Sequence, residues 1–414
     1  MKILIKNIKS LVQVEESPRL KVRGKDMANL NCLNESWLAI EEDKIVDFGL
    51  MSSWPGISDW SNLTVIDASG KMVFPSWCDS HTHIVYAGSR ENEFVDRIHG
   101  LSYEEIAKRG GGILNSAIRL HQTSEEELTG QALKRLEEIK MMGTGAVEIK
   151  SGYGLSVEDE IKMLRVIKKL QTLSPLTIKA TFLGAHAIPK EYKENRQKYI
   201  KLIINEMLPI VAKEELAEYC DVFCEKNYFT YEETKKILQA ALKYNIQPKV
   251  HAEQMSHSGG IKAGVECNAV SVDHLEWADD SDIQLLQKSS TIPTLLPGSQ
   301  FFLGLQNPPV RKMIAAGLPV AVASDYNPGT CPSGNMNFML SLCCILYKMT
   351  PEEAINAATI NSAAAMGLTK THGSIAIGKK ANIFITKEIS GYAFIPYSFA
   401  NNLIETVIIN GIVQ

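Results

Sequence analysis

The stretch of sequence that decides the fold is Met72-Val-Phe-Pro-Ser-Trp-Cys78-Asp-Ser-His81-Thr-His83. Its apolar part, Met72 to Cys78, indicates a buried strand, and a His-x-His pair ends it. Residues i and i+2 of a strand point to the same side, so His81 and His83 direct two imidazoles at one point. Two neutral imidazoles that converge suit a divalent metal such as zinc or iron. Alone, the pair is equally compatible with two surface histidines in a loop.

A third histidine and an aspartate lie far downstream, each at the end of another apolar segment. His251 ends the segment 246–251, and Asp325 ends the segment 318–325. Four potential ligands at three separate strand ends rarely arise by chance. We therefore predict a site for one divalent ion per subunit, either Zn2+ or Fe, because three imidazoles and a carboxylate suit both metals. The predicted metal ligands are His81, His83, His251 and Asp325.

The composition is that of a globular protein without a strong excess of either charge. Of the 414 residues, 45% are hydrophobic, and the formal net charge is −4. The chain has no basic stripe for nucleic acid and no uninterrupted apolar segment of membrane-spanning length. Residues 1–8 alternate lysine with aliphatic residues, which is typical of a strand and not of a signal peptide. Eight cysteines without a C-x-x-C pair indicate reduced thiols and a cytoplasmic location.

Short β-rich apolar segments alternate with amphipathic helical segments along the middle of the chain, which predicts an α/β fold with a parallel sheet. The expected strands are 73–79, 146–150, 177–184, 221–225, 248–253, 271–276, 291–296 and 319–325. The expected helices include 125–142, 157–173, 198–213, 231–244 and 309–316. Eight such units predict a closed TIM-like (β/α)8 barrel over residues 70–374. Chemistry in that fold gathers at the C-terminal strand ends, where the four predicted ligands lie.

The two ends of the chain have a different pattern from the middle. Residues 1–69 and 375–414 contain short strands and turns, and neither segment has enough strands to bury both faces of a sheet alone. We therefore expect the two segments to pair into one small composite β-sandwich beside the barrel.

Six short motifs and the order of the predicted ligands point to a known family. The motifs are Arg90-Glu-Asn-Glu-Phe94, Gly110-Gly-Gly-Ile113, Val147-Glu-Ile-Lys-Ser-Gly-Tyr-Gly-Leu155, Gly184-Ala-His-Ala187, His251-Ala-Glu-Gln254 and Ser324-Asp-Tyr-Asn-Pro-Gly-Thr330. A His-x-His pair after the first barrel strand, histidines after the fifth and sixth, and an aspartate after the eighth resemble the amidohydrolase superfamily. The motifs, in this order, resemble its imidazolonepropionase family across nearly the whole chain.

This resemblance implies a metal-dependent hydrolase of histidine degradation, and a homodimer. The reaction would open the ring C–N bond of 4-imidazolone-5-propanoate to give N-formimidoyl-L-glutamate. Asp325 would take a proton from the attacking water and pass it to the departing ring nitrogen. His274, at the end of the sixth strand, would polarise the carbonyl or stabilise the developing oxyanion. The alternative for His274 is a buried structural histidine.

Substrate contacts follow from the same resemblance. Arg90 would grip the propanoate carboxylate in a bidentate fork, although a surface arginine paired with Glu91 or Glu93 is the alternative. The other expected substrate contacts are Tyr103, Tyr153, His186, Gln254, Asn327, Gly329 and Thr330. His186 is otherwise a structural histidine bonded to a loop carbonyl, and Asn-Pro-Gly is also an ordinary turn. The remaining histidines on helix or loop patterns, which we expect to be exposed, are His99, His121, His257 and His372.

Other functions remain open at this point. A nucleobase deaminase of the same superfamily would share the metal ligands, but it would use a glutamate where this chain has Gln254, which cannot titrate. A cyclic-imide hydrolase with two metals would need a bridging lysine on the fourth strand, whereas Lys150 lies on the second. A non-catalytic structural relative would be expected to lose metal ligands, and all four are present.

Overall fold

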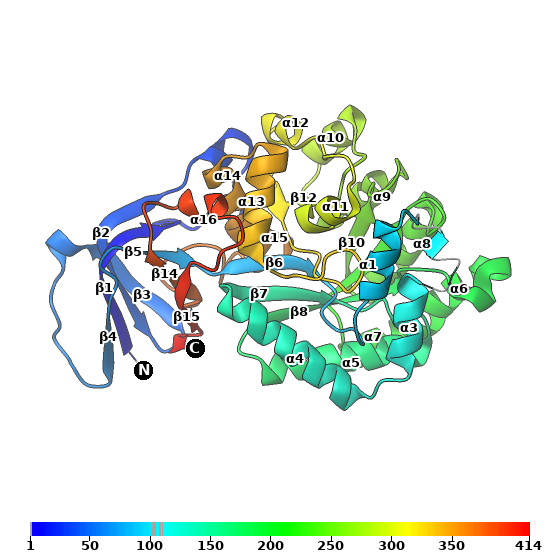
Figure 1. The fold of residues 1–414 in the computed structure, drawn as a ribbon, viewed down its shortest axis with the longest axis horizontal. Coiled ribbons are helices and arrows are strands. Elements are labelled where there is room, and N and C mark those ends of the chain that lie inside the picture. The colour runs from blue at the N-terminus through cyan, green and yellow to red at the C-terminus, as the bar shows by residue number, and fades with distance from the viewer. Residues whose placement is uncertain (1, 102–104, 107–108, 110) are drawn as a thin grey trace.

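The computed structural model describes residues 2–101, 105–106, 109 and 111–414. A barrel with its helices forms the larger part of the molecule, and a sheet built from both ends of the chain lies beside it (Figure 1). The N- and C-terminal ends, drawn in blue and red, meet in that sheet.

The barrel contains eight parallel strands among the described residues, in sequence order around the ring. They are β6 (Trp77–Thr82), β7 (Thr144–Lys150), β8 (Thr177–Ala185), β9 (Tyr219–Cys224), β10 (Gln247–Ala252), β11 (Ser271–His274), β12 (Ile292–Leu295) and β13 (Ala321–Val322). The ring closes next to β6, where the His83 N–H donates to the Tyr326 carbonyl at 2.8 Å and the Asp325 N–H donates to the His81 carbonyl at 3.0 Å. The predicted α/β class and eight-stranded barrel are confirmed.

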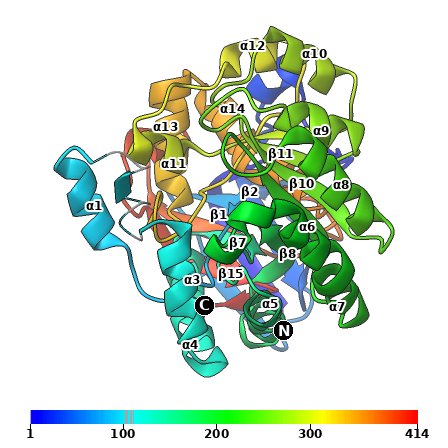
Figure 2. The same cartoon turned by 90° about the vertical axis from the view of Figure 1, so that its right-hand side faces the viewer.

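Helices cover the outside of the barrel (Figure 2). They are α1 (Glu91–Ile98), α3 (Ile113–His121), α4 (Glu125–Met141), α5 (Val157–Leu173), α6 (Arg196–Leu202), α7 (Leu208–Lys213), α8 (Tyr231–Leu242), α9 (Gly260–Glu266), α10 (Asp280–Gln287), α11 (Pro297–Leu303) and α12 (Val310–Ala315), followed by α13 (Met336–Tyr347), α14 (Pro351–Asn356), α15 (Ser362–Ala365) and α16 (Phe394–Tyr397). Helix α5 has the predicted bounds because Ser156 caps its N-terminus and its apolar residues repeat at helical spacing. The predicted helix 198–213 is interrupted by a π-helical turn over Ile203–Met207.

The apolar run from Met72 to Cys78 belongs to two different sheets. Strand β5 (Lys71–Pro75) pairs with β1 (Lys2–Val12) and with β14 (Ile383–Glu388), whereas β6 begins at Trp77 and pairs with β7. The expectation of one strand over 73–79 is therefore wrong. Both halves are buried on both sides, so their hydrophobicity is continuous and hides the change of sheet at Ser76. The chain leaves the terminal sheet there, beyond the boundary expected at residue 70.

The terminal segments share one mixed sheet with its own apolar core. Besides β1, β5 and β14, it contains β2 (Cys32–Glu41), β3 (Lys44–Leu50), β4 (Leu63–Asp67), β15 (Ile404–Ile409) and β16 (Ile412–Val413). Hydrogen bonds join these strands into one continuous sheet. Side chains from both ends of the chain, such as Ile5 and Ile383, pack in a core separate from the main barrel core. Strand β5 therefore ties the terminal sheet covalently to the first barrel strand.

Two observations concern the pairing of the cysteines and the length and polarity of the helices. All eight cysteines are unpaired, and Cys78, Cys220 and Cys343 are among those that are buried. Among the described residues, no helix combines the length and the apolar character that crossing a bilayer requires.

Candidate active site

Four strand ends bring the predicted metal ligands and His274 to one point in the barrel. His81 and His83 come from the end of β6, His251 from β10 and His274 from β11, and Asp325 follows β13. All five side chains are buried. The His81 and His251 ring centres are 4.4 Å apart, and those of His81 and His83 are 5.3 Å apart. The Oδ1 atom of Asp325 lies 3.7 Å from His81 Nε2 and 3.6 Å from His83 Nε2.

These side chains fit a divalent cation. Ligand atoms of His81, His83 and Asp325 all lie within 4.8 Å of one another, as do those of His81, His251 and His274. The Nε2 atoms of His81 and His251 are buried and have no hydrogen-bond partner in the described part of the chain. Buried polar atoms without a partner are costly, and a bound cation would satisfy them. Imidazole nitrogens with one carboxylate are a donor set that suits zinc or iron.

Two of the predicted histidine ligands, His81 and His83, are held in the neutral form that metal ligation requires. Burial is the main cause that lowers the pKa of His81 well below its usual value, and Lys150 and the neighbouring histidines add to the effect. Burial likewise lowers the pKa of His83, with His186 as the next contributor. Neutral imidazoles keep a lone pair available for a metal near neutral pH.

Two of the site residues have backbone conformations that L-residues rarely adopt. The φ angle of His274 is 89° and that of Asp325 is 55°. Both residues stand where a barrel strand ends, and the left-handed conformation turns the chain sharply there. Such conformations cost free energy and persist where the surrounding structure enforces them, often at functional sites.

His274 has a carboxylate neighbour that sequence reasoning missed. Oε1 of the buried Glu276 lies 3.7 Å from His274 Nδ1. Burial lowers the pKa of His274, but Glu276 and the nearby Asp325 raise it more, so that it stands above the usual value. His274 lines the pocket, where its ring can donate a hydrogen bond. Glu276 lies beyond the end of β11 and after the sharp turn at His274, so the side-chain alternation of a strand does not predict its position.

His186 and Tyr153 form one wall of the pocket beside His83. His186 Nδ1 lies 2.9 Å from the Gly152 carbonyl, which only accepts hydrogen bonds, so Nδ1 carries the proton. Burial lowers the pKa of His186 to about 3, and its neutral ring stacks against His83 with centres 5.3 Å apart. The Tyr153 ring centre is 5.5 Å from that of His186. His186 thus has the loop-carbonyl bond of a structural histidine and also lines the same pocket as His83.

Arg90 is buried and lines the same pocket. Its Nε and Nη2 atoms donate to Glu93 Oε2 at 2.9 and 2.6 Å. The alternative considered above was an exposed arginine paired with a glutamate. The pair with Glu93 exists, but Arg90 is buried, with only 7% of its surface exposed. Glu93 also accepts from the Gly112 N–H at 3.0 Å, so it links Arg90 to the segment that precedes α3. Arg90 shares the pocket with His83, His251 and Asp325.

The loop after β13 is organised by the Asn327 side chain. Its Nδ2 donates to the Asp325 carbonyl and to Thr330 Oγ1, both at 2.7 Å. Its Oδ1 accepts from the N–H groups of Gly329 and Thr330, both at 2.8 Å. These four bonds use the full capacity of the amide. Asn327 and Thr330 line the pocket, but the Asn327 side chain holds the loop together, as in the ordinary turn considered above.

Gln254 and Glu253 have separate roles. Gln254 is buried and lines the pocket. Glu253 turns away from it: its carboxylate accepts from the N–H groups of Gly259, Gly260 and Ile261, at the start of α9. Glu253 is a structural residue that anchors this helix, and Gln254 is the pocket residue.

Two further expectations concern residues away from this cluster. Tyr103 lies outside the described residues. His372 was expected to be exposed and is instead buried. Its Nε2 lies 3.0 Å from Thr177 Oγ1 on β8 and 3.2 Å from Asn382 Nδ2 in the terminal segment. The sequence around His372 is typical of a loop, and it does not reveal that this loop is enclosed between β8 and the terminal segment. His99, His121 and His257 are exposed as expected.

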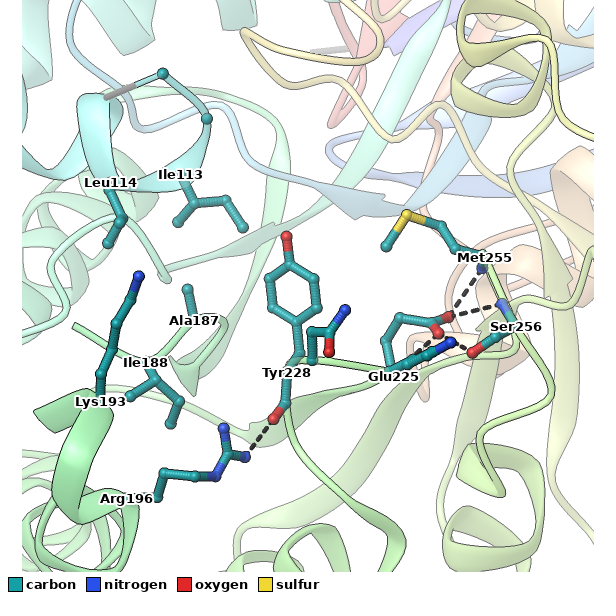
Figure 3. Close-up of a pocket in the computed structure, with 14 residues that line it drawn as sticks. Ile113, Leu114, Ala187, Ile188, Lys193, Arg196, Glu225, Tyr228, Met255 and Ser256 are labelled. Atoms are coloured by element: carbon teal, nitrogen blue, oxygen red, sulfur yellow. Dashed lines mark hydrogen bonds between the residues drawn. The ribbon is translucent and has the colours of Figure 1, made fainter. Parts of the chain in front are cut away.

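A larger outer pocket of about 740 Å³ (Figure 3) adjoins the pocket that His83, Arg90 and Asp325 line. Ile113 and Met255 line both pockets, so they stand at the boundary between them. Tyr228 projects into the outer pocket, and its ring packs on Phe223 with centres 4.4 Å apart. Phe223 in turn lies beside His186 and His251. The outer pocket therefore provides an approach to the buried site.

Solved structures with the same fold include enzymes of low sequence identity to this chain. An atrazine chlorohydrolase from Arthrobacter aurescens, complexed with zinc, superimposes with a TM-score of 0.71 and 13% identity, over 99% of this chain and 94% of that one. The guanine deaminase of E. coli gives a TM-score of 0.75 with 12% identity, over 100% of this chain and 98% of that one. At these identities the likeness establishes the fold alone.

Sequence relatives are much closer. The imidazolonepropionase of Flavobacterium johnsoniae is 58% identical over 408 residues, which covers 99% of this chain and 98% of that protein. That of Christiangramia forsetii is 58% identical over 411 residues, with 99% of both chains covered, and that of Alkaliphilus oremlandii is 43% identical over 410 residues, covering 99% and 97%. Residues 72–413 match the amidohydrolase family. The chain therefore belongs to the amidohydrolase family and, within it, to the imidazolonepropionases.

Proposed function

We propose that this protein hydrolyses the ring C–N bond of 4-imidazolone-5-propanoate to give N-formimidoyl-L-glutamate. The observation that carries the proposal is that one pocket joins the predicted metal ligands to a buried arginine. His83, His251 and Asp325 lie in the same pocket as Arg90. The substrate has a ring amide to be opened and a propanoate to be held, and the pocket has groups for both. The full-length similarity to imidazolonepropionases supports the same function.

Arg90 orients the substrate in this proposal. Its guanidinium binds the propanoate, and its bonds to Glu93 hold it in place. The ring then extends toward Asp325 and His274, so that its carbonyl carbon faces the attacking water. Tyr153 and His186 contact the ring from the side. Because binding through the remote carboxylate fixes the reacting carbonyl, Arg90 contributes to rate as well as affinity.

His274 and Asp325 handle charge and protons. Water attacks the ring carbonyl carbon, and Asp325 accepts the proton that this water loses. His274 donates a hydrogen bond to the carbonyl oxygen as negative charge develops there. When the ring C–N bond breaks, Asp325 returns the proton to the departing nitrogen. Water has then been added across the bond, with a carboxylate on one side and the formimidoyl nitrogen on the other.

A divalent ion held by His81, His83, His251 and Asp325, Zn2+ or Fe and one per subunit, would supply Lewis acidity that makes water nucleophilic near neutral pH. His81 and His83 serve this role in their neutral form, and Asp325 adds the one negative charge of the set.

Gln254 distinguishes this function from nucleobase deamination. A deaminase would require a titratable group at that position to protonate the base, and the Gln254 amide only forms hydrogen bonds. Glu253 does not replace it, because its carboxylate is bound to backbone N–H groups at the start of α9. We assign Gln254 to hydrogen bonding with the substrate.

The test is a direct assay of the purified, metal-loaded protein. Incubation with 4-imidazolone-5-propanoate should remove its ultraviolet absorbance and give N-formimidoyl-L-glutamate, identified by mass spectrometry. Guanine and cytosine should release no ammonia. Ammonia release without loss of the imidazolone would indicate a deaminase, and inertness toward all three compounds would indicate a non-catalytic relative.

We also propose that the protein is a cytoplasmic homodimer. The eight unpaired cysteines are consistent with a reducing compartment. Light scattering coupled to size-exclusion chromatography would test the oligomeric state, since a mass near the 45.8 kDa of one chain would contradict a dimer.

A further inference from the structure

A cluster of charged side chains fills the barrel interior beneath the candidate metal site. Its members, which we call the interior ion cluster, are Glu148 and Lys150 on β7, Asp221 on β9, Lys249 on β10 and Asp273 on β11. All five are fully buried. The interior of this barrel type is usually packed with branched aliphatic residues, so charge at this place requires an explanation.

Lys150 is the central member of the cluster. Its Nζ lies 2.7 Å from Glu148 Oε1, 2.7 Å from Asp221 Oδ2 and 3.8 Å from Asp273 Oδ2. Lys249 binds the other oxygen of Glu148. Through its ammonium group, Lys150 thus joins carboxylates from three different strands.

Two of these carboxylates reach the metal ligands directly. Asp273 Oδ2 lies 2.7 Å from His81 Nδ1. Asp221 Oδ1 accepts from the His251 backbone N–H at 3.0 Å, and its Oδ2 lies 3.0 Å from His251 Nδ1. This last distance is short enough for a hydrogen bond, but the two groups are not aligned for one. A carboxylate beside each Nδ1 favours a proton on that nitrogen and leaves each Nε2 lone pair directed at the site.

The energetics argue against a role in folding stability alone. Removing charged groups from water is costly, and buried ion clusters are often no more stabilising than apolar residues of the same volume. The cluster contains two ammonium groups and three carboxylates, and it contacts two predicted metal ligands on different strands. Orienting those two histidines explains its presence better than stability does.

We propose that Lys150 is a positioning residue for the metal site. Its ammonium group holds Asp221 and Asp273 in place, and these carboxylates fix the ring orientations of His251 and His81. The inference rests on the proposed function only in that the site binds a divalent ion. Metal affinity and metal spectra are measured without substrate, so the inference can fail or hold independently of the proposed reaction.

The test compares Lys150→Met with Lys379→Met. Lys379 is an equally buried lysine, but it binds the His372 carbonyl and Ser374 Oγ, away from the site. Chelator competition should give Lys150→Met a 10- to 100-fold higher dissociation constant for Zn2+, as is typical when a group that orients a ligand is lost. The Co2+-substituted variant should show an altered visible spectrum. Lys379→Met should lower thermal stability with parental Zn2+ affinity and Co2+ spectrum.

A second variant covers the case in which Lys150→Met does not fold. Asp273→Asn keeps the size of the side chain and removes the charge beside His81 Nδ1, so it should also weaken Zn2+ binding and change the Co2+ spectrum. The inference is overturned if folded Lys150→Met loses no more affinity than Lys379→Met. It is overturned equally if Lys150→Met does not fold and Asp273→Asn retains the parental affinity and spectrum.

Discussion

The guanidinium of Arg90 lies directly against the backbone of Gly329. A Cβ atom built on residue 329 would overlap Arg90 Nη1 and stand 2.5 Å from Cζ. The Arg90 guanidinium therefore occupies the space that a side chain at residue 329 would need. The contact couples the loop after the first barrel strand to the loop after the eighth, and Glu93 holds Arg90 from the other side. The position of the proposed carboxylate anchor is thus set by two loops at once.

Gly329→Ala should displace Arg90 and weaken substrate binding. Because small displacements of an orienting group are costly, we expect kcat/KM to fall by about 10- to 100-fold, with metal content unchanged. Steady-state kinetics and metal analysis would measure both. Gly130→Ala is the matched control, since a Cβ there meets nothing within 4 Å. Parental kcat/KM in Gly329→Ala would show that the contact does not place Arg90.

Two substitutions, Arg90→Lys and Arg90→Ala, should separate the effect of positive charge at residue 90 from that of the guanidinium geometry on substrate binding. Lysine keeps the charge but loses the fork that grips a carboxylate, and alanine loses both. We expect kcat/KM to fall in both variants, further for alanine, with metal content unchanged. Alanine should also narrow the preference for the acid over an uncharged propanamide analogue. If Arg90→Ala discriminates between the two as strongly as the parent, Arg90 is not the carboxylate anchor.

His251→Ala should empty or weaken the metal site. The substitution removes a buried Nε2 that has no hydrogen-bond partner among the described residues. We expect metal content to fall well below that of the parent and turnover to be lost. Elemental analysis after dialysis, with His99→Ala as an exposed control, would measure the effect. Full activity of metal-stripped parent protein would contradict the proposed role of the site.

The sequence predicted the site well where potential metal ligands stand at the ends of predicted strands. Four residues could be predicted as metal ligands because they end apolar segments and parallel strands bring their C-terminal ends together. These residues are His81, His83, His251 and Asp325. The structure places all four within one buried cluster with His274. This much requires only the alternation of elements and the identity of the last residue in each strand.

Other features depend on contacts between segments distant in sequence. The hydrophobicity of residues 72–78 is continuous across Ser76, so it does not reveal that β5 and β6 join different sheets. Lys150 was identified only by its place on the second strand, because its partner Asp221 is 71 residues away. The burial of His372 depends on the packing of the terminal segment against β8. Periodicity describes one segment at a time and does not contain such information.

His274→Ala should retain metal and lose kcat. His274 is placed to donate a hydrogen bond to the carbonyl oxygen as charge develops, and removing such a donor costs about two to four decades in rate. KM should change less than kcat, because the interaction strengthens in the transition state. Metal content and steady-state kinetics would be measured together. Near-normal kcat with a full metal complement would leave His274 with a structural role only.

His372 should make the folded protein sensitive to acid. Burial is the main cause that lowers the pKa of His372 to about 3, and Lys380 and Lys379 add to the effect. The unfolded chain has the ordinary histidine pKa of about 6.5. Between these two values the unfolded state binds a proton that the folded state does not. The free energy of unfolding therefore decreases as the pH falls through this window, by at most about 1.4 kcal/mol per pH unit from this one group.

His372→Gln should reduce this pH dependence. Glutamine still forms hydrogen bonds with Thr177 and Asn382 but does not titrate. Between pH ~4 and ~6, the slope of unfolding free energy against pH should therefore decrease by an amount that corresponds to at most about one bound proton. Urea unfolding of metal-free protein at several pH values would measure the slope without the pH dependence of metal binding. The parent protein, unfolded under the same conditions, supplies the reference slope. An unchanged slope in His372→Gln would show that the folded protein protonates His372 as readily as the unfolded chain does.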